Sequence, residues 1–405
     1  MTIRFNNLTV ARFAAALLVY LHHSTPAEYT AMSDIPEYFL RFVHNGYVGV
    51  SFFFIVSGFV LAASNLGRLA DFSIKRSLSF YWKRVARIVP LWLVVSLPLI
   101  YWAARNQQPQ LFPFLTFTQA WNPEITTAFG LLGVSWTLSV EMFFYLMFPL
   151  IAAAMKPFGS KWTGPVVVLL GLSAPALSCW YFASSPELMA LQPFDPNSSH
   201  FWLYRFPLAR MGEFVAGIGI FICIDRLPAK VPAWSVWAFG SMSVAALVYT
   251  MTTIPIYEVY YVFPNAIYFA GIVAALAYLE TLGTSVTSRP LILLGESSFA
   301  FYLVHQYYFK GFIADPMLAL GGVWVSLTYV LLMGIATSIG LFLMIETPCR
   351  DFLLSAFRVR STMPAPEVID INALVVVPSV APGLDEAGVD FGQSRAGCTR
   401  EPQIS

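Results

Sequence analysis

An arginine and a histidine lie at the two ends of one apolar run near the start of the chain. Arg12 and His23 are eleven residues apart in RFAAALLVYLHHS, which is about three turns of an α-helix. Both would share a face, separated by roughly 16 Å, or about half the hydrocarbon core of a bilayer. Imidazole can take a proton from a hydroxyl near neutral pH, and guanidinium binds phosphate. The pattern is therefore typical of a helix that joins two compartments, although an interfacial Arg12 and a helix-capping His23 would look the same.

Ionisable side chains recur inside other apolar runs, where they are costly and hence functional candidates. They are His22, Glu141, Arg210, Glu213 and His305. The expected helix directions place them with His23 in the outer half of the membrane. We expect Glu141 to orient His23 and raise its basicity. Arg210 and Glu213 could instead pair along their own helix, and His22 would point about 100° away from His23, so only one of the two histidines should face the site.

A basic cluster precedes the third apolar run, in YWKRVARIVPLW. Arg84 and Arg87 share a helix face, and paired guanidiniums suit the phosphates of a cytoplasmic donor. Ordinary positive-inside topology would account for the same residues. Both interpretations stay open from the residues alone.

Small residues occur at intervals along the second apolar run, GYVGVSFFFIVSGFVLA. They are Gly46, Gly49, Ser57 and Gly58. Small side chains let helices approach closely, or let a ligand approach the backbone. Helix packing is the simpler interpretation of each glycine.

Ten apolar runs could position these groups as membrane helices. The chain is 58% hydrophobic and 11% charged, whereas soluble domains have about 25% charged residues. We therefore predict an all-α, polytopic membrane helix bundle within the lipid bilayer. The expected spans are 8–24, 46–64, 88–104, 131–154, 164–183, 208–224, 233–252, 260–280, 291–312 and 322–345.

The basic residues predict cytoplasmic termini, because lysine and arginine gather in the segments that would then be inside. The outside segments carry only Arg41, Arg105 and Arg205, with Lys310 near a boundary. Residues 1–355 form the expected transmembrane domain. Residues 361–405 are rich in Pro, Ala, Val and Gly with acidic residues, and we predict that they form a mostly disordered cytoplasmic tail.

Several function classes are disfavoured by the composition. The net charge of +1 offers no argument for nucleic-acid binding. The four cysteines, the histidines and the carboxylates lack metal-ligand spacing, so neither a metal site nor a disulfide framework is expected. Buried His, Glu and Arg would also suit a proton-coupled transporter or flippase, although we find no inverted repeat. A structural partner in an envelope-assembly complex is a third alternative.

Six motifs, in order along the chain, resemble the acyltransferase-3 family of integral membrane acyltransferases. They are RFAAALLVYLHH, GVSFFFIVSGFVLA, RVAR before IVPLW, SWTLSVEMFFYLMFP, RMGEFVAGIGI and LGESSFAFYLVHQ, with IETPCRDF a weaker match. The resemblance covers about residues 1–355. It implies about ten membrane helices and acyl-CoA-dependent O-acylation of extracytoplasmic carbohydrates or other hydroxyl-bearing molecules, such as a macrolide.

The resemblance also implies roles for individual residues. His23 would be essential to transfer, and Arg84 and Arg87, with Arg12 nearby, would hold the CoA donor. The family's Trp–Ser–Glu element falls on Trp136, Ser139 and Glu141, and its Ser–Tyr–His element on Ser298, Tyr302 and His305, in acceptor-site or supporting roles. From the residues themselves, we assign possible acceptor-site or supporting roles also to Ser57, Arg210 and Glu213. The expected co-substrate is acyl-CoA, with acetyl-CoA the leading choice, without a further cofactor. The expected location is the cell (cytoplasmic) membrane, and direct transfer and an acyl-His intermediate both stay open.

Overall fold

The computed structural model describes residues 5–24, 36–156, 158–191, 195–227, 231–253, 255, 262–309 and 314–356. These residues form helices joined by turns, without a strand among them, which confirms the all-α prediction. The tail predicted at 361–405 and Lys310 lie outside the described residues.

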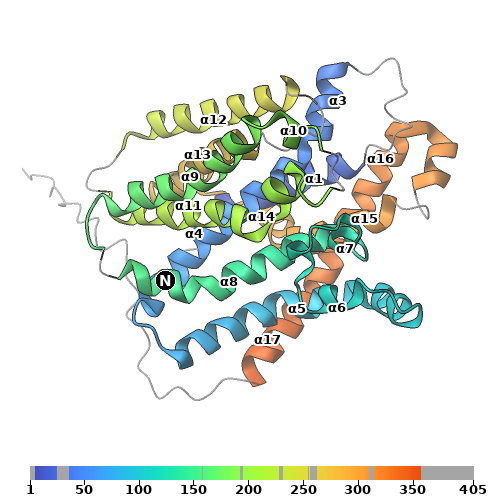
Figure 1. Cartoon of the computed structure of the whole chain (residues 1–405), viewed down its shortest axis with the longest axis horizontal. Helices are drawn as coiled ribbons and strands as arrows, with labels where there is room; N and C mark the ends of the chain where they lie inside the picture. Colours follow the sequence, from blue (N-terminus) through green and yellow to red (C-terminus); the bar gives the residue numbers. More distant parts are fainter. Residues whose placement is uncertain are drawn as a thin grey trace, which may run out of the picture. The chain divides into compact units, whose positions relative to one another are not determined.

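Helix α1, Asn6–His23, is the centre of the arrangement. It contacts α4 (Gly49–Leu69), α13 (Val262–Thr281), α14 (Arg289–Glu296) and α15 (Ser298–Phe309). Figure 1 shows α1, α4 and α14 in the middle, between α12 (Ala233–Thr253) and α5 (Ile74–Arg105). A helix with apolar neighbours on several sides is held firmly, and so are the side chains that it presents.

The remaining helices flank this centre. The longer ones are α8 (Trp136–Met155), α9 (Thr163–Ala183), α11 (Pro207–Asp225), α16 (Ala314–Leu341) and α17 (Thr347–Ala356). The short ones are α3 (Glu37–His44), η1 (Asn45–Val48), α6 (Leu111–Leu115), η2 (Gln119–Trp121), α7 (Ile125–Phe129), η3 (Gly133–Ser135), α10 (Pro186–Met189), η4 (His200–Arg205) and η6 (Phe342–Glu346).

Seven helical segments within the described residues are long and apolar enough to cross a membrane. They are Glu37–Leu69, Ile74–Arg105, Gly133–Met155, Thr163–Ala183, His200–Asp225, Ala233–Thr253 and Val325–Ala356. This finding supports a multi-pass membrane protein. The count of ten spans and the cytoplasmic termini stay predictions.

Two differences between the predicted spans and the observed helices concern the candidate site. The run 291–312 is divided at Ser297, a fully buried residue whose hydroxyl donates to the Leu294 carbonyl at 3.2 Å. Helix α5 begins at Ile74, well before the predicted start at 88, so Arg84 and Arg87 lie inside a 32-residue helix. The basic residues therefore project from a continuous, rigid element.

Glycines let α4 approach two neighbours closely. A Cβ atom added to Gly58 would lie 1.9 Å from the Phe214 carbonyl oxygen of α11, and one added to Gly217 would lie 2.0 Å from that of Ile55. Just before α4, a Cβ atom added to Gly46 of η1 would lie 2.1 Å from the Leu18 carbonyl oxygen of α1. These distances confirm the helix-packing interpretation, since any side chain would force the backbones apart.

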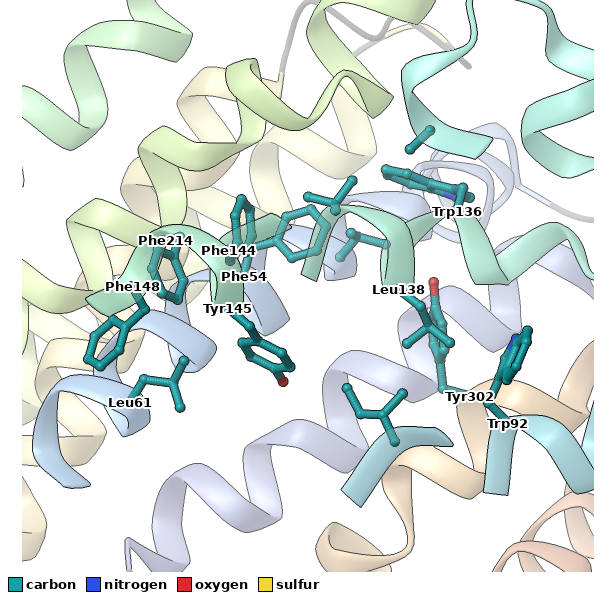
Figure 2. Packing of buried hydrophobic residues seen from close by; sticks show 14 of the residues in the cluster. Phe54, Leu61, Trp92, Trp136, Leu138, Phe144, Tyr145, Phe148, Phe214 and Tyr302 are labelled. Carbon is teal, nitrogen blue, oxygen red and sulfur yellow. The ribbon is translucent and has the colours of Figure 1, made fainter. Parts of the chain in front are cut away.

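An aromatic cluster joins α8 to α4 and α11. The rings of Phe144 and Phe214 stack with centroids 4.8 Å apart, and Phe54 meets Phe144 edge-on at 5.2 Å. Figure 2 shows Phe148 beside these rings and Tyr145 with its hydroxyl directed away from them. The cluster orients α8, which carries Glu141.

Candidate active site

His23 is hydrogen-bonded to a second histidine. Its Nδ1 lies 3.1 Å from Nε2 of His305, and the ring centroids are 5.1 Å apart. His305 is fully buried, while His23, the last residue of α1, is half-buried. The packing of α15 against α1 therefore brings together two imidazoles that are 282 residues apart in sequence.

Each histidine of this pair also faces a backbone carbonyl of its own helix. His23 Nδ1 lies 2.9 Å from the oxygen of Val19, and His305 Nδ1 lies 3.3 Å from that of Phe301. These contacts restrict the ring orientations and the positions of the ring protons.

His22 meets the ring of His23 edge-on, with centroids 4.9 Å apart, but its hydrogen bond goes to a different element. Its Nδ1 lies 2.5 Å from the His44 carbonyl oxygen, and its ring meets Tyr47 edge-on at 5.4 Å. The neighbouring positions thus point to different partners, as expected of consecutive residues on a helix. Of the two histidines, His23 is the one paired with His305.

Glu141 lies with Ser57 and Tyr145. The Ser57 hydroxyl donates to the Glu141 carboxylate at 3.3 Å, and the Tyr145 hydroxyl, one turn further along α8, donates to the same oxygen. We expected Glu141 to orient His23, but the side chain described as hydrogen-bonded to the His23 ring is His305. A catalytic role for Glu141 stays a prediction.

The three predicted donor-binding arginines converge, together with two carboxylates. Arg12 and Arg84 each interact electrostatically with Arg87 and with Glu141, while Glu346 interacts with Arg12 and Arg87. These groups come from α1, α5, α8 and η6. Arg350 and Glu296 also interact with Glu346. The four positive and three negative charges leave an excess of one positive charge, which favours an anionic ligand.

Glu346 was not among the predicted site residues. It is 4% exposed, and its Oε2 has no hydrogen-bond partner among the described residues. It lies just past the last predicted apolar run, in the weakest of the quoted motifs. That position, a carboxylate at the end of an apolar run, is the signal that could have found it.

Trp136 and Ser139 are buried at the start of α8 and make structural contacts. The Trp136 ring packs against Tyr204 of η4 with centroids 4.8 Å apart. The Ser139 hydroxyl accepts a hydrogen bond from the Ala120 backbone amide at 3.3 Å. Trp136 therefore packs the start of α8 against η4, and Ser139 bonds it to η2.

Tyr302 and Ser298 lie one turn apart on α15, on the side of His305. The Tyr302 hydroxyl accepts a hydrogen bond from Thr137 at 3.1 Å and donates to the Val134 carbonyl at 3.3 Å. Ser298 is fully buried, and its hydroxyl has no partner among the described residues. Tyr302 thus ties the helix that carries His305 to α8.

Arg210 and Glu213 form a buried ion pair along α11. Their closest atoms are 2.9 Å apart, and the side chains are 2% and 1% exposed. Arg210 also donates to the Ser51 hydroxyl of α4 at 3.1 Å. The pair lines a small cavity with Pro175 and Ser178 of α9. Pairing along the helix, one of the two expected alternatives, is what the structure shows.

The start of α1 is anchored by Glu280 of α13, which sequence reasoning missed. Its carboxylate accepts hydrogen bonds from the backbone amides of Asn6 at 2.7 Å and Asn7 at 3.1 Å, and from the Ser285 hydroxyl at 2.6 Å. Such bonds satisfy amides that the first turn of a helix leaves unpaired. They hold in place the helix that carries both Arg12 and His23.

Comparison with known proteins identifies the family. A family model described as an acyltransferase domain, that of the acyltransferase-3 family, matches residues 5–346. The chain is 31% identical over 321 residues to acyltransferase MdmB of Streptomyces mycarofaciens, covering 75% of this chain and 78% of that protein. It is 22% identical over 304 residues to the candidate O-acetyltransferases SACOL0978 and SAS0844 of Staphylococcus aureus strains COL and MSSA476, covering 67% of this chain and 48% of theirs.

The chain thus spans about half the length of the staphylococcal relatives. No solved structure matches it. The family model covers most of the chain, including α1, the pair of His23 and His305, and the charge cluster around Arg12. This chain therefore belongs to the acyltransferase-3 family and is an acyltransferase.

Proposed function

We propose that the protein is a membrane O-acyltransferase. It transfers an acyl group, expected to be acetyl, from cytoplasmic acyl-CoA to a hydroxyl of an extracytoplasmic carbohydrate or glycolipid. Family membership and two similar candidate O-acetyltransferases support ester formation. The acceptor class and the cytoplasmic donor are our proposal from the sequence topology and the arrangement of charges.

One observation carries the proposal: α1 presents an arginine of the charge cluster, Arg12, near its start and His23, hydrogen-bonded to His305, at its end. Arg12 and His23 are separated along the helix by roughly 16 Å. Phosphates of the donor would bind Arg12, Arg84 and Arg87. The pantetheine arm would extend between helices, so that the thioester reaches His23.

The reaction then needs one base and one leaving group. His23 takes the proton of the acceptor hydroxyl as that oxygen attacks the thioester carbonyl carbon. The carbon–sulfur bond breaks, the ester forms, and the CoA thiolate receives the proton from His23. Acyl-CoA and alcohol thus give ester and free CoA, and His23 returns to its starting form.

The test compares His23→Ala with the matched control His22→Asn in purified protein reconstituted in lipid. Asparagine can still donate to the His44 carbonyl, so the control should keep most of its activity even though it removes the ring that meets His23 edge-on. Loss of a general base lowers the rate by about 100-fold or more, and the release of CoA from acetyl-CoA measures it. Full activity of His23→Ala at equal membrane abundance would overturn the proposed mechanism.

The acceptor is identified by mass spectrometry of envelope polysaccharides and glycolipids from cells with and without the gene. Loss of an acyl mass from a glycan would support the proposal. Loss of the acyl mass from a small lipophilic alcohol, such as a macrolide, would instead identify that alcohol as the acceptor and overturn the proposed carbohydrate acceptor. Movement of a solute across liposomes without consumption of acyl-CoA would favour a transporter instead.

A further inference from the structure

We infer that His305 is the positioning residue of the transfer reaction: it accepts a hydrogen bond from His23 Nδ1, and so aims the other ring nitrogen of His23 at the acceptor. The inference rests on the proposed function, in which His23 is the base. It assigns to a neutral imidazole the task that a carboxylate performs in a Ser-His-Asp triad.

The positions of the ring protons follow from the two carbonyl contacts. A carbonyl oxygen only accepts hydrogen bonds. His23 Nδ1, 2.9 Å from the Val19 oxygen, must therefore carry a proton, and so must His305 Nδ1, 3.3 Å from the Phe301 oxygen. In neutral rings the second nitrogen of each then holds a lone pair.

This assignment also satisfies the contact between the rings. His305 Nε2 is an acceptor and His23 Nδ1 is a donor, and the two atoms are 3.1 Å apart. The His23 N–H is thus shared between the Val19 carbonyl and His305. The reverse assignment would leave a lone pair of His23 Nδ1 facing the Val19 oxygen, which is repulsive. The lone pair of His23 therefore lies on Nε2, the nitrogen that takes the acceptor proton.

Proton transfer makes the His23 ring positive, and its surroundings favour that charge. The N–H at Nδ1 keeps both of its acceptors, His305 Nε2 and the Val19 carbonyl. His23 is also the last residue of α1, and a helix C-terminus stabilises a cation. His305 therefore lowers the energy of the transition state more than that of the resting enzyme, and its loss should appear in kcat.

The surroundings of His305 hold its ring still. It is fully buried and stacks on Phe301, with centroids 6.2 Å apart and planes 23° apart. Tyr302 packs against it at 5.8 Å and is itself hydrogen-bonded to Thr137. A fixed acceptor orients its donor, because the His23 ring cannot turn without losing the bond.

The experiment compares two variants of similar size in the full-length protein, with acetyl-CoA as donor and the acceptor that the mass spectrometry described above identifies. His305→Gln keeps a side-chain oxygen that can accept from His23 Nδ1, whereas His305→Leu keeps none. We expect His305→Leu to lower kcat by about 10- to 100-fold with the KM for acetyl-CoA within about twofold. His305→Gln should recover most of this loss. His200→Gln, a control in a histidine of η4 whose ring contacts Phe129 and Tyr204, should leave kcat unchanged.

A second measurement avoids variants that fail to fold. In wild-type protein labelled with ¹⁵N-histidine, NMR should show His23 and His305 each protonated at Nδ1, with signals assigned by loss in the variants that express. The opposite tautomer of either ring would overturn the inference, as would equal kcat in the two His305 variants. If His23→Ala is inactive while His305→Leu is fully active, only this inference fails; if His23→Ala is active, the proposed function fails.

Discussion

Glu141 and Tyr145 are hydrogen-bonded to each other one turn apart on α8. The carboxylate therefore faces the side of the bundle where Arg12 and Arg84 lie, since both guanidiniums interact electrostatically with Glu141 and with Tyr145. Glu141 is thus one of the charges beside Arg12 and Arg84, the residues that we propose bind the donor. It also leaves His23 to a different partner.

Replacing Glu141 with alanine should weaken the use of the donor more than it slows transfer. Without the carboxylate, Arg12 and Arg84 lose an opposite charge with which both interact electrostatically. We expect the KM for acetyl-CoA to rise about 10-fold, with a smaller change in kcat. Tyr145→Phe, which removes only the phenol, should have a weaker effect. A loss confined to kcat, comparable with that of His23→Ala, would instead place Glu141 at the transfer step.

The arginine pair on α5 should recognise the phosphates of the donor. Arg84→Gln combined with Arg87→Gln should lower kcat/KM for acetyl-CoA by about 10- to 100-fold, as charge-assisted hydrogen bonds are lost. Acetyl-pantetheine lacks the nucleotide phosphates, so its kcat/KM should hardly change. An equal loss for both donors would show that the two arginines act on something other than phosphate.

Gly58 should tolerate no side chain. An added methyl group would clash with the Phe214 carbonyl and push α4 away from α11, and overpacking of this kind costs about 1–3 kcal/mol. We expect Gly58→Ala to lower the unfolding temperature in detergent. Gly67→Ala is the matched control on the same helix, because nothing lies within 4 Å of its added Cβ atom; it should be neutral or slightly stabilising. Equal Tm values for the two variants would contradict the close contact of α4 and α11.

The ion pair of Arg210 and Glu213 should be sensitive to the loss of either partner. Arg210→Met or Glu213→Leu alone leaves one buried charge unpaired, which costs about 3–5 kcal/mol. Removal of both charges, in Arg210→Met with Glu213→Leu, should recover much of that stability. Thermal unfolding of the four proteins measures the coupling. Additive losses in the double variant would mean that the two side chains do not depend on each other.

Local properties of the chain could be predicted from the sequence. Long apolar runs predicted helices, because a backbone in lipid must satisfy its own hydrogen bonds. Helical periodicity placed Arg12 and His23 on one face and turned His22 to another. The small residues Gly46 and Gly58 predicted close helix contacts. Each of these predictions depends on residues within a few turns of one another.

Only the tertiary structure decided which helices meet. His23 has His305 as its ring partner, and the two are 282 residues apart. Glu141 joined Ser57 and the arginines, and Glu346 entered the same cluster from the far end of the chain. The pattern of a single helix states which face carries a charge but not which neighbour lies opposite. That choice depends on the packing of apolar and small residues between helices, such as Gly58 against Phe214, and this packing is a property of the whole bundle.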